Sequence, residues 1–252
     1  MTNSDIYRKC WARSLGNCAG PMSKEHIFSQ AVGRKTARTS IAVVGMANMQ
    51  DGPIGPDWPK ARILCQHHNS GLSLLDTEAK KLADGLHSFA DGAQHTVVHL
   101  NGLLLERWAL KTAINYMAAG LGDTNKWLPN EGLVRNVFGL APLPNRCGLY
   151  LQRTHEYNPL SSEQAGVTPA WRGLKDGTPL ELMGASLYLH GATFFVLLQT
   201  YFLDVLKTKG LDFSKSNLPL TYDRLAYHPI AAQIHNDVGH TLTALLDWPS
   251  AE

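Results

Sequence analysis

Two stretches of the chain carry apolar residues three and four positions apart, which is the spacing of one face of an amphipathic helix. The first stretch predicts a helix that ends at Gly92, and the second predicts a helix from about Leu103 to Ala119 that ends at Gly120. The positions that form the two patterns are Leu72, Leu75, Ala79, Leu82, Leu86 and Phe89, followed by Leu105, Trp108, Ala109, Thr112 and Tyr116.

The pattern beyond Gly122 favours β-structure. Strand candidates are Cys147–Arg153, Leu180–Leu189 and Thr193–Phe202, separated by Gly, Pro and Asp. A helix followed by several strands predicts an α+β domain with an antiparallel sheet. We place the domain boundary between the two helices, giving an N-terminal domain of residues 1–95 and an accessory domain of residues 96–252.

The stretch from Gly184 to Leu203 has no Asp, Glu, Lys or Arg and is nearly long enough to span a membrane. His190-Gly191 lies in its middle, where a two-residue turn would divide it into two β-rich halves. A membrane helix and a buried β-hairpin are both compatible with this composition. The break favours the hairpin, and with it a cytoplasmic protein without a membrane partner.

Residues 1–64 are irregular, with many Gly, Pro, Ser and Asn and one short strand candidate, Ile41–Met46. Such a segment buries little apolar surface by itself, so we expect a metal to stabilise it. Cys10-x7-Cys18 and Cys65-x2-His68 form a four-ligand set of the kind that holds structural zinc, with His67 as an alternative to His68. Cys147 stands alone and is expected to be a small buried side chain.

The net charge of +2 gives no global indication of a nucleic-acid partner. Residues 1–62, however, hold nine Lys and Arg against four Asp and Glu. This excess includes a group at Arg34, Lys35 and Arg38 and a pair at Lys60 and Arg62. The segment could contact a phosphate backbone, although an ordinary solvated loop explains the charge equally well.

Two short motifs are interleaved with the zinc ligands. Ser23-Lys24-Glu25-His26-Ile27-Phe28 lies between the two ligand pairs, and Asn69 directly follows the second pair in Cys65-Gln66-His67-His68-Asn69. In this order the motifs resemble the HNH, or ββα-metal, nucleases of bacteria and phages. The resemblance covers about residues 8–90 and implies an α+β fold that begins with a zinc-bound ββα-metal domain.

The resemblance implies an endonuclease that hydrolyses DNA phosphodiester bonds, with a role in defence against foreign DNA or in phage biology as a hypothesis. His26 would be the general base, because a neutral imidazole can take a proton from water near physiological pH. Glu25 and Asn69 would hold a catalytic Mg²⁺ or Mn²⁺ through oxygen ligands. Cys10, Cys18, Cys65 and His68 would hold structural zinc.

The third position of the family motif departs from its usual His or Asn. Ser73 stands four residues after Asn69, and Asp76 follows one turn later. Asp76 could complete the cation shell, or Ser73-x-x-Asp76 could form a helix capping box. A catalytically silent zinc module that binds nucleic acid or protein, and an RNA-directed nuclease, are therefore kept as alternatives.

Residues 100–252 contain no catalytic motif that we recognise. Arg107 and Lys111 share one helix face, where they could meet a phosphate or a carboxylate, although a solvated face is favoured. His235, Asp237 and His240 are interpreted as ordinary strand and loop residues rather than a metal site. The second domain could mediate oligomerisation or bind a regulatory protein.

Overall fold

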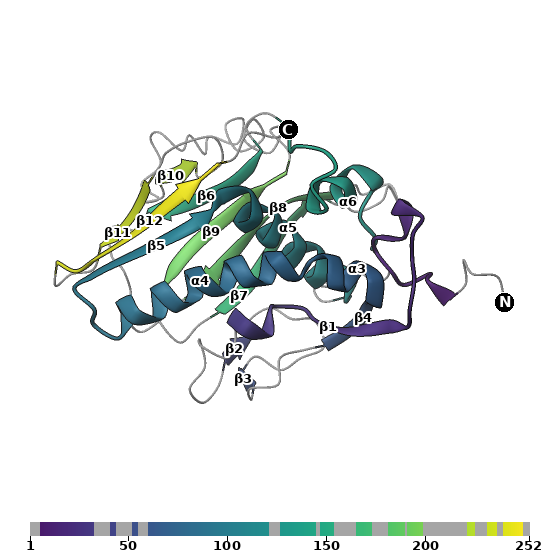
Figure 1. Cartoon of the computed structure of the whole chain (residues 1–252), viewed down its shortest axis with the longest axis horizontal. Coiled ribbons are helices and arrows are strands. Elements are labelled where there is room, and N and C mark those ends of the chain that lie inside the picture. The colour runs from purple at the N-terminus through teal and green to yellow at the C-terminus, as the bar shows by residue number, and fades with distance from the viewer. Residues whose placement is uncertain are drawn as a thin grey trace.

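The computed structural model describes residues 6–32, 41–43, 52–54, 60–120, 127–144, 147–153, 165–172, 181–189, 191–198, 221–224, 231–235 and 239–248. It is a mixed α+β fold, as the sequence predicted at that level (Figure 1). The elements are η1 (Arg13–Leu15), β1 (Met22–His26), β2 (Ile41–Val43), β3 (Gly52–Ile54), β4 (Lys60–Cys65), α3 (Gln66–Gly71), α4 (Ser73–Ala90), β5 (His95–Asn101), α5 (Gly102–Ala118), α6 (Glu131–Val137), β6 (Gly148–Arg153), β7 (Ala165–Arg172), β8 (Glu181–Leu189), β9 (Ala192–Leu197), β10 (Thr221–Arg224), β11 (Ala231–His235) and β12 (Thr241–Asp247).

The N-terminal part is organised around the antiparallel pair of β1 and β4. Met22 pairs with Cys65 at one end and His26 with Lys60 at the other, with a bulge between Ser23 and Glu25. Helix α3 begins directly after β4 at Gln66, and α4 follows at Ser73. Strands β2 and β3 form a second two-stranded sheet.

Both predicted long helices are present, within a residue or two of the expected ends. Helix α4 buries the apolar face expected from its pattern. Helix α5 is buried on most of its surface, because it contacts α4, α6 and strands of both larger sheets. The side chain of Asn101 caps α5 by accepting a hydrogen bond from the backbone amide of Leu104 at 3.0 Å.

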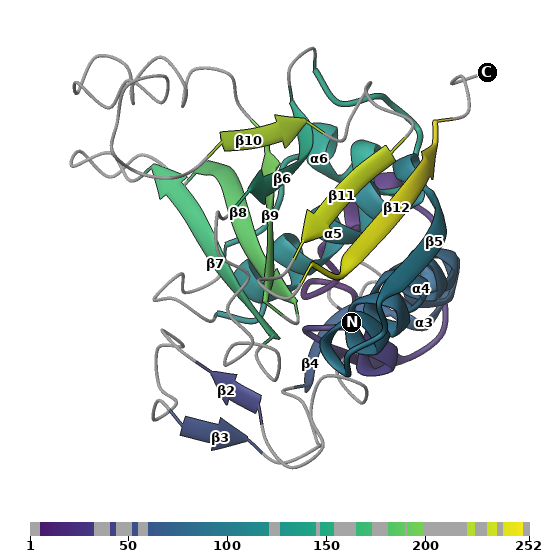
Figure 2. The same cartoon turned by 90° about the vertical axis from the view of Figure 1, so that its left-hand side faces the viewer.

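Two larger sheets lie against these helices (Figures 1 and 2). One is antiparallel with strand order β10-β6-β9-β8-β7, and the other has the order β11-β12-β5. Strands β8 and β9 form the predicted hairpin, with Gly191 in the turn at a φ of +81°. Within the described residues, no helix is long and apolar enough to cross a membrane.

Strand β5 was not predicted from the sequence, which placed only a domain boundary between the two helices. Its side chains alternate, with Val98 and Leu100 buried and Val97 and His99 exposed. It pairs in parallel with β12, at the far end of the chain. A short alternating segment gives little local signal, and its partner strand is what stabilises it.

The predicted boundary near residue 95 falls at the start of β5. Helix α4 packs closely on this strand at Gly85, where an added Cβ would collide with the side chain of Val98. One cluster of buried apolar residues extends from Cys10 to Leu246 and so includes side chains from both sides of the boundary. The two-domain division remains a prediction.

Candidate functional site

Four potential metal ligands meet where the N-terminal loop, β4 and α3 come together. Cys10 precedes the short 3₁₀-helix η1, and Cys18 precedes β1. Cys65 ends β4, and His68 lies in α3. Their ligand atoms all lie within 4.8 Å of one another. The sulfur atoms of Cys10, Cys18 and Cys65 lie 3.4, 3.6 and 3.2 Å from Nδ1 of His68.

These separations fit the edges of a tetrahedral zinc site. Zn–S bonds of about 2.3 Å and Zn–N bonds of about 2.0 Å, at the tetrahedral angle, place sulfur and nitrogen about 3.5 Å apart. Among the described residues, no other group of three or more His, Cys, Asp and Glu side chains brings its ligand atoms together in this way. The Cys₃His cluster could therefore hold a metal such as zinc, as the sequence spacing predicted.

The structure selects His68, rather than its neighbour, as the cluster's imidazole. Nε2 of His68 donates a hydrogen bond to Oδ1 of Asn17 at 2.6 Å, which leaves Nδ1 directed at the sulfurs. Nε2 of His67 instead lies 3.2 Å from the amide nitrogen of Asn17. Asn17 was not identified from the sequence, although it directly precedes the ligand Cys18.

The thiols of the cluster differ in their acidity. Burial raises the pKa of Cys10, although backbone amides of Cys65 and Ala12 act to lower it. Burial and the neighbouring sulfurs together raise the pKa of Cys18. Burial also acts to raise the pKa of Cys65, but backbone amides of His68 and Ala19 donate to its sulfur and lower the pKa overall. Thiolates this close together repel one another, so a bound cation stabilises their deprotonated forms.

A second cluster joins the N-terminal part to α5. Nζ of Lys111, on α5, lies 2.8 Å from Oε1 of Glu25 on β1. The same nitrogen donates to Oδ2 and Oδ1 of Asp76, on α4, at 2.8 and 3.0 Å. Lys111 is only 1% exposed, so the favoured interpretation of a solvated face was wrong for this residue. We call Glu25, Asp76 and Lys111 the carboxylate–lysine cluster.

Hydrogen bonds extend this cluster to other elements. Asn69 donates from its side chain to Glu25. The hydroxyl of Ser29 donates to Asp76 and accepts a hydrogen bond from Nε1 of Trp108 at 2.8 Å. Asp76 is therefore engaged with Lys111 and Ser29, and α4 has no side-chain cap at its N-terminus. The capping-box interpretation of Ser73 and Asp76 was wrong.

The cluster alters the pKa of two of its members. Burial acts to lower the pKa of Lys111, but the charges of Asp76 and Glu25 outweigh it and raise the pKa. Burial raises the pKa of Glu25, and the ammonium of Lys111 offsets this only in part. The lysine thus stays protonated, and Glu25 is the carboxyl that takes up a proton more readily than usual.

The divalent cation expected at Glu25, Asn69 and Asp76 does not fit this arrangement. Mg²⁺ binds oxygen at about 2.0–2.1 Å and needs several such oxygens around it. The carboxylate oxygens here are bound to a buried ammonium, which already carries the positive charge between them. No reaction step is therefore assigned to a cation at this position.

His26 directly follows Glu25 in the sequence, but its side chain lies on the opposite face of β1. Successive strand residues point to opposite faces, and Glu25 points toward α4 and α5. His26 lies directly across from Lys60, and its backbone oxygen accepts a hydrogen bond from Nδ2 of Asn115 at 3.5 Å. Its imidazole is half-buried, and Nε2 has no contact with solvent.

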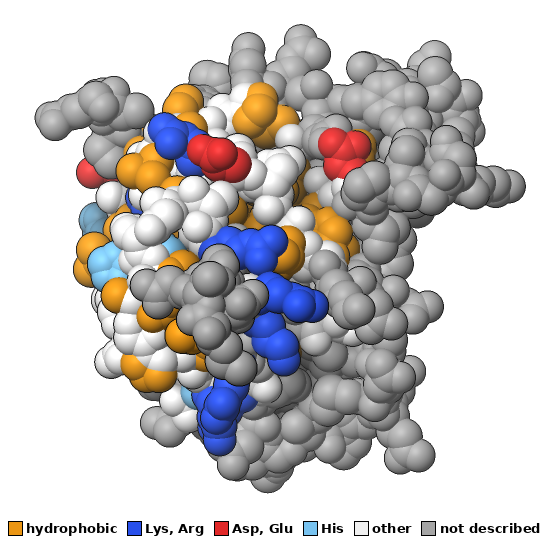
Figure 3. Space-filling view, turned by 90° about the vertical axis from the view of Figure 1, so that its right-hand side faces the viewer, with side chains coloured by type: hydrophobic (Ala, Val, Ile, Leu, Met, Phe, Trp, Pro, Cys, Tyr) orange, Lys and Arg blue, Asp and Glu red, His pale blue; other side chains and the backbone are white. Residues whose placement is uncertain are grey.

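Exposed basic side chains accompany His26 on the β1–β4 pair. Lys24 on β1 and Lys60 and Arg62 on β4 are all exposed. We call these three residues the basic face. Figure 3 shows a band of Lys and Arg side chains on the side of the molecule where β1, β4 and α6 lie in Figure 1. The group at 34–38 lies outside the described residues.

Helix α5 supports the site through one stripe of polar side chains. Trp108, Lys111 and Asn115 lie three and four residues apart and contact Ser29, Glu25 and His26 respectively. Asn115 also accepts a hydrogen bond from Nε1 of Trp11 at 3.0 Å. The polar residues within the apolar α5 pattern were the available signal for this stripe. Arg107, outside it, donates from Nε to the backbone oxygen of Val137 at 2.7 Å.

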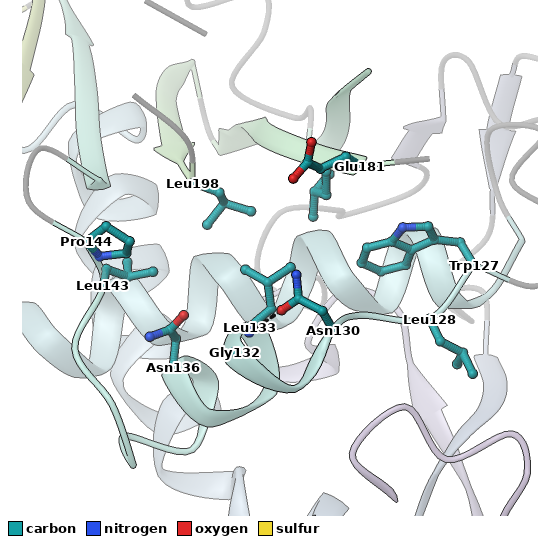
Figure 4. Close-up of a pocket in the computed structure, with 11 residues that line it drawn as sticks. Trp127, Leu128, Asn130, Gly132, Leu133, Asn136, Leu143, Pro144, Glu181 and Leu198 are labelled. Carbon is teal, nitrogen blue, oxygen red and sulfur yellow. Dashed lines mark hydrogen bonds between the residues drawn. The ribbon is translucent and has the colours of Figure 1, made fainter. Parts of the chain in front are cut away.

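A separate cavity of about 530 Å³ lies between α6 and the start of β8 (Figure 4). Two asparagine side chains in its lining have structural roles. Oδ1 of Asn130 caps α6 through the amide of Leu133, and Nδ2 of Asn136 donates to the backbone oxygens of Ala141 and Pro142. Apolar side chains and the acidic side chain of Glu181 complete the lining, and none of the predicted site residues is part of it.

The remaining histidine and cysteine predictions concern single residues. Cys147 is buried, as expected. His235 ends β11 and lies 3.1 Å from the hydroxyl of Thr241, while His240 precedes β12. Asp237 lies outside the described residues.

Comparisons with protein-family models, with curated proteins and with solved structures find no match to this chain.

Proposed function

We propose that the chain is an HNH-type endonuclease that hydrolyses phosphodiester bonds in DNA, with His26 as the general base. The observation that carries this proposal is the order and placement of three features. His26 ends β1, and Asn69 lies in α3, the helix that follows the partner strand β4. The Cys₃His cluster brings together the loop before β1, the end of β4 and α3. These are the features on which the resemblance to HNH nucleases rests.

In this proposal Cys10, Cys18, Cys65 and His68 hold a structural zinc. Four protein ligands fill a tetrahedral shell and leave no position for water or substrate, which is typical of structural rather than catalytic zinc. A bound zinc would contribute on the order of 10 kcal/mol to the stability of the N-terminal segment. Its role would be to fix β4 and α3 relative to the loop that leads into β1.

The basic face supplies what a phosphodiester substrate needs beside the general base. Lys24, Lys60 and Arg62 would neutralise backbone phosphates next to His26. His26 would take a proton from water, and the resulting hydroxide would attack phosphorus. The leaving oxygen would take a proton from solvent water as the P–O bond breaks. Because the ring is half-buried, the proposal requires that substrate binding bring water within reach of it.

A catalytically silent zinc module that binds nucleic acid is the second candidate. Two observations favour it. Nε2 of His26 is buried, and the carboxylates expected to hold a catalytic cation are bound to Lys111. Such a module would use the same basic face for binding, without hydrolysis.

Cleavage assays on the full chain decide between these candidates. Wild type, His26→Ala and His99→Ala would be incubated with plasmid DNA, single-stranded DNA and RNA in Mg²⁺, in Mn²⁺ and in EDTA. His99 is a matched control because it is an exposed histidine on β5. We expect wild type and His99→Ala to cleave DNA, and His26→Ala to be slower by about 10²–10⁴-fold.

Each other outcome rejects part of the proposal. Binding without cleavage under all conditions would establish the silent module. Cleavage of RNA alone would reassign the substrate. Equal cleavage by wild type and His26→Ala would remove His26 as the base.

A further inference from the structure

The ammonium of Lys111 has the coordination that a bound cation would have. It contacts three carboxylate oxygens from two side chains, Glu25 on β1 and Asp76 on α4, at 2.8 to 3.0 Å. A lysine ammonium has three N–H donors, and here each has an acceptor. One of these oxygens belongs to Glu25, which the resemblance to HNH nucleases implies as a ligand of a divalent metal. The other two belong to Asp76, which could complete the shell of that metal.

Burial makes this arrangement persistent. The side chain of Lys111 is 1% exposed, that of Glu25 is 9% exposed and that of Asp76 is 29% exposed. Removing one member of a buried ion pair leaves the other charge uncompensated, which is strongly destabilising. A metal ion from solvent would have to displace the ammonium and leave a buried lysine without its partners.

The surrounding side chains hold the lysine in place. Trp108, one turn earlier on α5, donates to Ser29, whose hydroxyl donates in turn to Asp76. The side chain of Asn69 also donates to Glu25. The two carboxylates are therefore fixed by neutral hydrogen bonds as well as by the ammonium.

We infer that Lys111 is the resident cation of this site and replaces the divalent metal that the HNH-like motif would otherwise bind. The carboxylate–lysine cluster then binds α5 to β1 and α4 and takes up no Mg²⁺ or Mn²⁺. In the proposed function, the exposed side chains of the basic face supply positive charge beside His26. The inference concerns metal binding alone, so it can stand whether or not the chain cleaves DNA.

Removing the lysine is expected to create a metal site. Without it, the remaining oxygens come from two carboxylates and the neighbouring side chains of Asn69 and Ser29, which is a donor set that Mg²⁺ and Mn²⁺ accept. The test is a Mn²⁺ titration of the full-length protein, in which electron paramagnetic resonance measures the free ion.

Four proteins would be compared: wild type, Asp76→Asn, Lys111→Met and Lys81→Met. Lys81 is the matched control, because it forms an ion pair with Glu78 on α4 but is 53% exposed. We expect wild type, Asp76→Asn and Lys81→Met to bind Mn²⁺ equally weakly. Lys111→Met should gain one site with a dissociation constant at least about tenfold lower, because two carboxylates lose their counter-ion.

Two results would overturn the inference. One is a Mn²⁺ site in wild type that Asp76→Asn abolishes, since the carboxylates would then bind metal beside the lysine. The other is a folded Lys111→Met protein that gains no site. If Lys111→Met does not fold by circular dichroism, the comparison of wild type with Asp76→Asn decides by itself.

Discussion

Nε2 of His68 donates a hydrogen bond to Oδ1 of Asn17 at 2.6 Å, and this contact points Nδ1 of the same ring at the three cysteine sulfurs. The orientation of a metal-binding imidazole is commonly set in this way, by an acceptor on its far nitrogen. Asn17 and Cys18 are consecutive, so the residue that orients one ligand is bonded to another.

Replacing Asn17 with Ala should weaken zinc binding by about 10- to 100-fold, because the His68 ring loses the contact that fixes its orientation. The measurement is a competition titration against a chromophoric chelator. His67→Ala is the matched control and should retain wild-type affinity, since His67 contacts Asn17 from outside the cluster. A larger loss in His67→Ala than in Asn17→Ala would make His67 the ligand.

Replacing Cys65 with Ser should remove about one zinc per chain and unfold the N-terminal segment, because structural zinc supplies much of the folding energy of such segments. Elemental analysis and circular dichroism give the two readouts. Cys147→Ala is the control, because Cys147 is also buried but lies outside the cluster. Equal zinc content in both variants would exclude the Cys₃His site.

The raised pKa of Glu25 predicts a specific dependence of stability on pH. Its folded-state pKa lies above the ordinary value of 4.5, so the carboxyl favours the folded state most at pH below 4.5. That contribution is lost as pH rises through the folded-state pKa. The free energy of unfolding of wild type minus that of Glu25→Gln should therefore decrease as pH rises from about 4 toward neutrality.

Urea unfolding of both proteins across this pH range measures that difference. A difference that increases with pH would show that the ammonium of Lys111 outweighs burial and lowers the pKa of Glu25. The direction of the slope is informative even though Glu25→Gln also weakens the ion pair with Lys111.

Replacing Arg62 with Gln should weaken DNA binding and reduce the slope of log K against log salt concentration by about one, as expected for one lost phosphate contact. Fluorescence anisotropy at several salt concentrations provides both values. Lys80→Gln is the control, because Lys80 is exposed but forms an ion pair with Asp84 on α4. Equal slopes for the two variants would place the phosphate contacts away from the basic face.

The local sequence pattern was sufficient to predict those parts of the structure in which residues close in sequence are also close in space. The spacing of apolar residues determined α4 and α5, because a helix brings residues three and four apart onto one face. Cys65 and His68 are three residues apart at the junction of β4 and α3, so their proximity was also a local property. The charge-free stretch and its central His-Gly predicted the β8–β9 hairpin for the same reason.

Only the tertiary structure decided which residues meet across long distances. Lys111 reaches Glu25 and Asp76 because α5 packs across β1 and α4, and no sequence spacing encodes that contact. The parallel pairing of β5 with β12 likewise joins distant segments. The sequence thus determined which side chains can bind a metal. Packing decided that the Cys₃His ligand atoms lie close enough to share a metal ion. Packing also decided that the ammonium of Lys111 pairs with the carboxylates of Glu25 and Asp76.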